Sequence, residues 1–121
     1  MKSMRFDYEY LKKLVDNLIE PGSKLKIEDR SSLNDYFYFL TLEGLEDEQK
    51  GIEIFEVYTK LGNYCEEKKI KFYVGFFFSL SELLTVKYRI KARGHEFMAD
   101  KSLSKEEWEK RFDVTKKRLN L

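Results

Sequence analysis

Cys65 and His95, the single cysteine and the single histidine of the chain, have the greatest potential for covalent chemistry. A thiol and an imidazole can work together as nucleophile and base. Cys65 falls on the apolar stripe of a predicted helix, however, and a free cysteine in such a position is usually buried and inert. We therefore expect no catalytic pair, and the protein is predicted not to be an enzyme.

Metal and cofactor chemistry finds little support in the sequence. His95, Glu96 and Asp100 could offer three ligands, but they are loosely spaced, and a structural or surface role is favoured. One histidine excludes a multi-histidine centre, and one cysteine excludes a cysteine-rich zinc site. The glycines lack the close spacing of a phosphate-binding loop: Gly44, Gly51, Gly62, Gly75 and Gly94. No metal and no cofactor are predicted.

Acidic residues gather in the second quarter of the chain. Residues 28–56 contain nine acids and two bases, although the whole chain has a net charge of only +1. A helix dipole favours carboxylates at the helix start, so one interpretation is an ordinary solvated N-terminus. The other is an acidic surface that mimics nucleic acid or binds a basic protein. The candidate protein-binding residues are then Glu43, Glu46, Asp47, Glu48, Glu53 and Glu56.

Basic residues dominate a later segment. Residues 68–93 contain seven bases and one acid. Alternate residues of a strand share a face, so the last bases of this segment would form one face able to track phosphates. The alternative is a solvent-facing strand edge whose lysines prevent pairing with another chain. The candidate nucleic-acid-binding residues are Lys87, Arg89, Lys91 and Arg93.

The aromatic run Phe76, Phe77 and Phe78 allows two interpretations. Exposed phenylalanines could stack on the bases of a single strand. A strand with apolar residues on both faces is more often buried on both sides. We therefore expect these three side chains to belong to the core.

Sequence periodicity predicts the elements that hold these residues. Apolar residues recur at helical spacing over 6–19 and 46–68. A short helix is predicted over 92–100, and a last helix begins at Ser104, where Glu107 completes a capping box. Alternating or aromatic segments predict strands over the ranges 24–28, 36–43, 70–79 and 84–90.

The chain as a whole is predicted to be one α+β domain, residues 1–121, with two antiparallel hairpins and three or four helices. A chain of 121 residues is one ordinary domain, long enough to bury a core. No apolar segment of a signal peptide follows the N-terminus. The longest apolar run, residues 72–78, is too short to cross a membrane as a helix. Together with the single cysteine, these features predict a cytoplasmic protein with no membrane partner.

The segment 88–98 resembles the strand-to-helix signature of small winged-helix-like proteins of unknown function carried by phages and prophages. In that family an apolar residue, a serine or threonine and two variable positions precede the sequence Gly-His-Glu-Phe-Leu. Here residues 94–97 match, whereas Met98 replaces the leucine and Lys91 replaces the serine or threonine. The resemblance extends over roughly residues 46–100.

This resemblance implies a winged-helix-like centre. The helix at 46–68 takes the place of the recognition helix, and the hairpin at 70–90 forms the wing. That helix begins with several acids, and acids repel phosphate, so it is not expected to read bases in a groove.

The leading hypothesis is a non-enzymatic binding or regulatory module of phage or prophage type that contacts nucleic-acid phosphates through a basic wing. The alternative is a protein-binding modulator or inhibitor of a host or defence protein, acting through the acidic surface. Salt-sensitive binding is expected in both cases, to nucleic acid in the first and to one protein in the second. The sequence identifies neither the target nor the oligomeric state.

Overall fold

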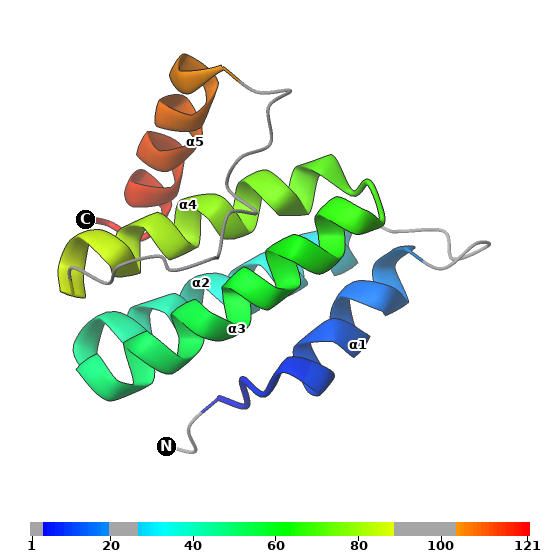
Figure 1. Cartoon of the computed structure of the whole chain (residues 1–121), viewed down its shortest axis with the longest axis horizontal. Coiled ribbons are helices and arrows are strands. Elements are labelled where there is room, and N and C mark those ends of the chain that lie inside the picture. The colour runs from blue at the N-terminus through cyan, green and yellow to red at the C-terminus, as the bar shows by residue number, and fades with distance from the viewer. Residues whose placement is uncertain (1–3, 20–26, 89–103) are drawn as a thin grey trace.

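The computed structural model describes residues 4–19, 27–88 and 104–121, and within these ranges the chain is helical without any strand (Figure 1). The predicted α+β class, its hairpins and the winged-helix-like centre are therefore wrong, and the protein is all-α in its described part. The helices are α1 (Tyr8–Ile19), α2 (Ile27–Glu46), α3 (Glu48–Glu67), α4 (Lys71–Tyr88) and α5 (Lys105–Arg118).

Helix α1 confirms the first predicted helix and starts two residues later than expected. Asp7 precedes it, and the Asp7 carboxylate accepts a hydrogen bond of 3.1 Å from the backbone N–H of Tyr10, as an N-cap does. Leu11, Val15 and Leu18 form its buried face. This face packs α1 against α2 and α3.

Helix α2 occupies the region where strands were expected. The strand predicted over 36–43 is wrong, because the whole segment is helical. The predicted strand 24–28 overlaps the start of α2 and otherwise lies outside the described residues. The buried residues of α2 fit the helical repeat of 3.6 and not the strand repeat of two: Leu33, Phe37, Leu40, Thr41 and Gly44.

Helix α4 replaces the predicted hairpin. The strands expected over 70–79 and 84–90 are wrong, since residues 71–88 form one continuous helix and residues 89–90 lie outside the description. This helix is apolar on most faces because it packs against α2, α3 and α5 at once (Figure 1). Phe77 is fully buried, Phe76 nearly so, and Phe78 is partly buried against the core. The predicted core role is thus confirmed for Phe76 and Phe77 and in part for Phe78, but the strand conformation is not.

Helix α3 was predicted over 46–68 and is confirmed over Glu48–Glu67. Only Asp47 separates α2 from α3. Three residues join α3 to α4, with Lys69 in the left-handed conformation (φ 61°). The N–H of Ile70 donates to the carbonyl of Cys65 at 2.8 Å, closing a Schellman cap. These short connections make α2, α3 and α4 antiparallel neighbours (Figure 1).

The last predicted helix is confirmed as α5, which begins directly after Ser104. The side chain of Glu107 is outside the description, so the predicted capping box stays a prediction. The short helix expected over 92–100 also lies outside the described residues. Helix α5 packs on α4, on the far side of that helix from α3 (Figure 1).

An aromatic cluster forms the centre of the core. The ring of Phe37 meets those of Tyr58, Phe76 and Phe77 edge-on, with centroid separations of 4.9–6.0 Å. The buried Tyr58 hydroxyl lies 2.9 Å from the Phe37 carbonyl and 2.9 Å from the Thr41 hydroxyl. These contacts give hydrogen-bond partners to the two hydroxyl groups and the carbonyl that are buried between α2 and α3.

Candidate functional site

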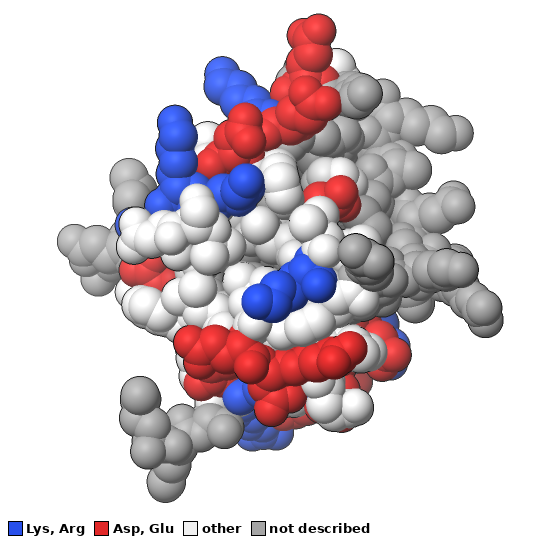
Figure 2. Space-filling view, turned by 90° about the vertical axis from the view of Figure 1, so that its left-hand side faces the viewer, with Lys and Arg blue, Asp and Glu red and all other residues white. Residues whose placement is uncertain are grey.

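The six acids singled out from the sequence lie around the junction of α2 and α3. Glu43 and Glu46 end α2, Asp47 links the helices, and the remaining three follow along the first turns of α3. Figure 2 views this end of the molecule and shows a band of acidic side chains across its lower half. Above the band the surface is mostly uncharged, with a basic side chain directly above the acids. The two helices thus bring the predicted acidic residues to one end of the fold.

Three of these acids have structural partners. Glu43 forms a part-buried ion pair of 2.5 Å with Lys50. Asp47 is the N-cap of α3, because its carboxylate accepts a hydrogen bond of 3.0 Å from the backbone N–H of Lys50. Glu53 accepts a hydrogen bond of 3.2 Å from Gln49. Part of the acidic cluster therefore serves the fold, as the helix-terminus interpretation predicted.

The other three acids present charge to solvent. Glu46, Glu48 and Glu56 are all exposed. Glu46 and Glu48 flank the single linking residue, so the two carboxylates stand on either side of the helix junction. These side chains are free to meet a partner without loss of a cap or an internal ion pair.

Tyr88 fastens the end of α4 to the acidic junction. Its hydroxyl donates a hydrogen bond of 2.6 Å to the carbonyl of Gly44. Its ring lies against Gly51, where an added Cβ would come within 2.4 Å of the ring. Burial, and then the charges of Asp47 and Glu48, raise the pKa of Tyr88. The end of α4 therefore lies in a negative field.

Lys87 is the one predicted nucleic-acid contact within the described residues. It is exposed on the last turn of α4, next to Tyr88. The other candidates, Arg89, Lys91 and Arg93, lie outside the described residues. The argument for a basic face depended on strand alternation, and the described part of that strand is helical. Lys87 thus stands at the acidic end of the fold.

An apolar groove adjoins the acidic junction. Its volume is about 300 Å³, and its walls come from the ends of α2 and α4, from the second half of α5 and from the C-terminal Leu121. Val86 and Leu121 are 66% and 60% exposed there. The apolar side chains of the walls are Leu45, Leu83, Val86, Phe112 and Leu121, with Lys87 and Lys116 at the rim.

Sequence reasoning missed this groove because it predicted a strand over 84–90, in which Val86 and Lys87 would point to opposite faces. On a helix, Leu83, Val86 and Lys87 share a face at spacings of three and four. That spacing was the available signal.

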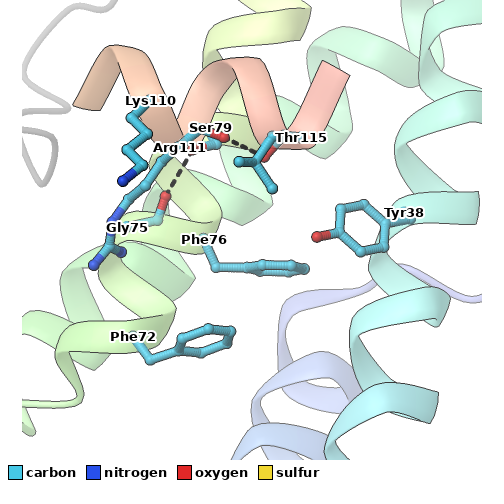
Figure 3. Close-up of a pocket in the computed structure, with 9 residues that line it drawn as sticks. Tyr38, Phe72, Gly75, Phe76, Ser79, Lys110, Arg111 and Thr115 are labelled. Atoms are coloured by element: carbon cyan, nitrogen blue, oxygen red, sulfur yellow. Dashed lines mark hydrogen bonds between the residues drawn. The ribbon is translucent and has the colours of Figure 1, made fainter. Parts of the chain in front are cut away.

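A second hollow, of about 340 Å³, lies between α4 and α5 (Figure 3). Phe72, Phe76 and Tyr38 provide aromatic surface, and Lys110 and Arg111 of α5 lie on one side of it. Sequence analysis did not find this site, because it needs α5 to cross α4 beside Gly75.

Of the sequence candidates for catalysis and metal binding, Cys65 alone lies within the described residues. Cys65 is fully buried, and burial followed by the charge of Asp16 raises the pKa of its thiol to about 12. The thiol is therefore protonated and inaccessible at neutral pH. His95, Glu96 and Asp100 lie outside the described residues. Among the described side chains, no three His, Cys, Asp or Glu residues gather as a metal ion would require.

None of the described helices is both long and apolar enough to span a membrane. The chain matches no known protein family, no curated protein and no solved structure. The resemblance to phage and prophage proteins stays a prediction based on a motif at 94–97 that lies outside the described residues.

Proposed function

We propose that this protein is a non-enzymatic binding module whose acidic end holds a basic, partly apolar segment of another protein and so modulates that protein. The observation that carries this proposal is the juxtaposition of exposed carboxylates and an apolar groove at one end of the helical bundle. The occupant must supply cations for the junction and apolar side chains for the groove.

The two features contribute differently to binding. Exposed carboxylates attract and orient a basic partner from solution, but exposed ion pairs contribute little affinity. Burial of apolar side chains supplies most of the affinity in protein interfaces. Val86 and Leu121 are exposed and available for such burial. A segment with lysines or arginines on one face and leucines on the other would use both features.

The acidic junction argues against nucleic acid as the ligand at this end. Phosphates are repelled by carboxylates, and Glu46, Glu48 and Glu56 present theirs to solvent. Lys87 is exposed beside these acids. The wing through which nucleic acid was expected to bind has no counterpart in the described part of α4.

The test uses a fluorescein-labelled helical peptide of lysine and leucine, with a matched peptide of glutamate and leucine. Fluorescence anisotropy should show saturable binding of the basic peptide only, and the affinity should fall as salt is raised. The double variant Glu46→Lys with Glu48→Lys should weaken binding about tenfold or more, because two attractions become repulsions. Val86→Asp should also weaken binding.

The matched control is Glu66→Lys with Glu67→Lys. These exposed acids lie at the other end of α3, about 27 Å away at 1.5 Å per residue. Asp47 is not reversed, because the loss of its cap would destabilise the start of α3. Failure of the basic peptide to bind, or equal effects of the control and test variants, would contradict the proposal. Preferential binding of a DNA duplex would do so as well.

A further inference from the structure

We propose that the hollow between α4 and α5 is a binding site for a small aromatic anion, a planar apolar group that carries a carboxylate or a phosphate. The hollow holds about 340 Å³, within the range of small-ligand sites and near its lower end. It shares no lining residue with the groove at the acidic end.

The apolar side of the hollow is an aromatic shelf. The rings of Phe72 and Phe76 are stacked, with centroids 6.0 Å apart and an interplanar angle of 21°. Tyr38 of α2 meets Phe76 edge-on at 5.2 Å. Phe72 is 44% exposed, although a large aromatic side chain gains by burial. A flat ligand on Phe72 would remove this surface from water.

The cationic side is built by the crossing of α5 over Gly75. A Cβ added at Gly75 would lie 1.6 Å from Nη1 of Arg111 and 2.6 Å from its Cζ. The absence of a side chain at position 75 therefore lets the guanidinium rest against α4, beside Phe72 (Figure 3). A planar guanidinium can donate two parallel hydrogen bonds to a carboxylate or a phosphate.

Lys110 places a second cation at the rim. Its side chain lies beside that of Arg111 (Figure 3) and is exposed. No carboxylate within the described residues pairs with Lys110. The positive charge of Lys110 would attract an anion to this rim.

Three hydroxyl groups line the hollow, those of Ser79, Thr115 and Tyr38, and their hydrogen bonds are compatible with a bound anion. Ser79 donates to the carbonyl of Gly75 at 3.1 Å, and Thr115 donates to that of Arg111 at 2.9 Å. Their protons are therefore used within their own helices. The Tyr38 hydroxyl points into the hollow (Figure 3) and has no hydrogen-bond partner among the described residues. It can donate to a bound anion. The described residues that line this hollow include no carboxylate.

The experiment titrates the full chain, labelled with nitrogen-15, with naphthalene-2-carboxylate and with 2-naphthyl phosphate. The neutral naphthalene-2-carboxamide, of equal size, is the ligand control. Amide signals of residues 72–76 and 111–115 should shift, and each anion should bind about tenfold more tightly than the amide because charge-assisted hydrogen bonds are the stronger ones. A preference between the two anions would identify the acidic group that the site favours.

Three variants test the assigned roles. Arg111→Gln should remove most of the preference for anions, whereas Phe72→Ala should weaken anion and amide alike. Gly75→Ala displaces only the flexible arginine side chain, so the fold should persist while the preference for anions falls. Lys117→Gln is the control, an exposed cation on α5 outside the hollow.

The inference is overturned by equal affinity for the anions and the amide, or by shifts that map to another part of the chain. The absence of saturable shifts at millimolar ligand would also overturn it. An equal loss of affinity in Lys117→Gln would show a general charge effect in place of a site.

Discussion

Tyr58 carries the buried polar contact between α2 and α3, and its hydroxyl can be tested alone. Tyr58→Phe removes the contacts to the Phe37 carbonyl and the Thr41 hydroxyl, while Thr41 keeps its own hydrogen bond of 2.7 Å to Phe37. We expect a loss of about 1 kcal/mol in the free energy of unfolding, the usual value for one buried hydrogen bond. Urea denaturation followed by circular dichroism measures it.

Tyr36→Phe is the matched control. The Tyr36 hydroxyl donates to the carbonyl of Arg5 in an exposed position, so water can replace it. Equal destabilisation by the two variants would contradict the special role of the buried hydroxyl.

Cys65 offers a second test, because the chain has no other thiol. The folded protein buries it fully and raises its pKa to about 12. A thiol reagent such as DTNB at about pH 8, near the pKa of a free thiol, should react with it only through unfolding. The reaction should be slow in buffer and complete within seconds in guanidinium chloride. Rapid reaction in buffer would show that the α3 core opens easily.

At the scale of elements, the start of α3 depends on a single capping carboxylate. Asp47→Ala leaves the N–H of Lys50 without its partner, so the free energy of unfolding should fall by about 1 kcal/mol. Asp47→Asn keeps an acceptor oxygen and should cost much less. Thermal unfolding of the two variants measures the difference. An equal loss in both would assign the effect to charge and not to the cap.

Two glycines in helix interiors should respond oppositely to alanine. At Gly51 a Cβ would lie 2.5 Å from the backbone carbonyl of Gly44, which cannot move without shifting α2. Gly51→Ala should therefore destabilise the protein by about 1–3 kcal/mol despite the better helix propensity of alanine. At Gly75 only an arginine side chain must move, so Gly75→Ala should leave stability unchanged or raise it. Urea denaturation of both variants distinguishes backbone crowding from side-chain crowding.

The helices differ in how far the sequence predicts them. Helices α1, α3 and α5 have one apolar stripe and a polar opposite face, a pattern that predicts an amphipathic helix. In α2, strand-forming aromatic residues such as Tyr36 and Phe39 surround the buried face and mask its helical spacing. In α4 the apolar residues cover most faces, so periodicity cannot separate a buried strand from a buried helix. The length of this segment, which forms one uninterrupted helix of 18 residues, was the better indication of a helix.

At the scale of the molecule, tyrosines couple stability to high pH. The hydrogen bond to Asp16, and then burial, raise the pKa of Tyr64 to about 12, and burial raises that of Tyr58 further. A raised pKa means that the folded state holds its proton more tightly. The stabilisation is complete below pH about 10, the ordinary tyrosine pKa, and is lost as pH rises through the folded value.

Alkaline titration should therefore unfold the protein cooperatively between about pH 10 and 12. Helicity at 222 nm and tyrosinate absorbance at 295 nm should change together. Tyr64→Phe should reduce the loss of stability per pH unit, because its proton no longer contributes. A tyrosinate signal that rises with an ordinary pKa while helicity persists would contradict the prediction.

The candidate sites could be predicted only in part. The acids around Glu46 and Glu48 are close in sequence, so any helix–turn–helix places them together. The two hollows need side chains from helices distant in sequence, such as Leu45 with Phe112 and Tyr38 with Arg111. Single-sequence periodicity carries no information about which helices meet, so these sites required the fold.

The connections of one and three residues on either side of α3 also bear on folding kinetics. Helices α2, α3 and α4 meet mainly as successive neighbours, so most of their contacts join residues near in sequence. Closing such small loops costs little entropy, and helical proteins with low contact order fold in microseconds to milliseconds. The central three helices can thus assemble early, with the apolar residues of α4 exposed to aggregation only briefly.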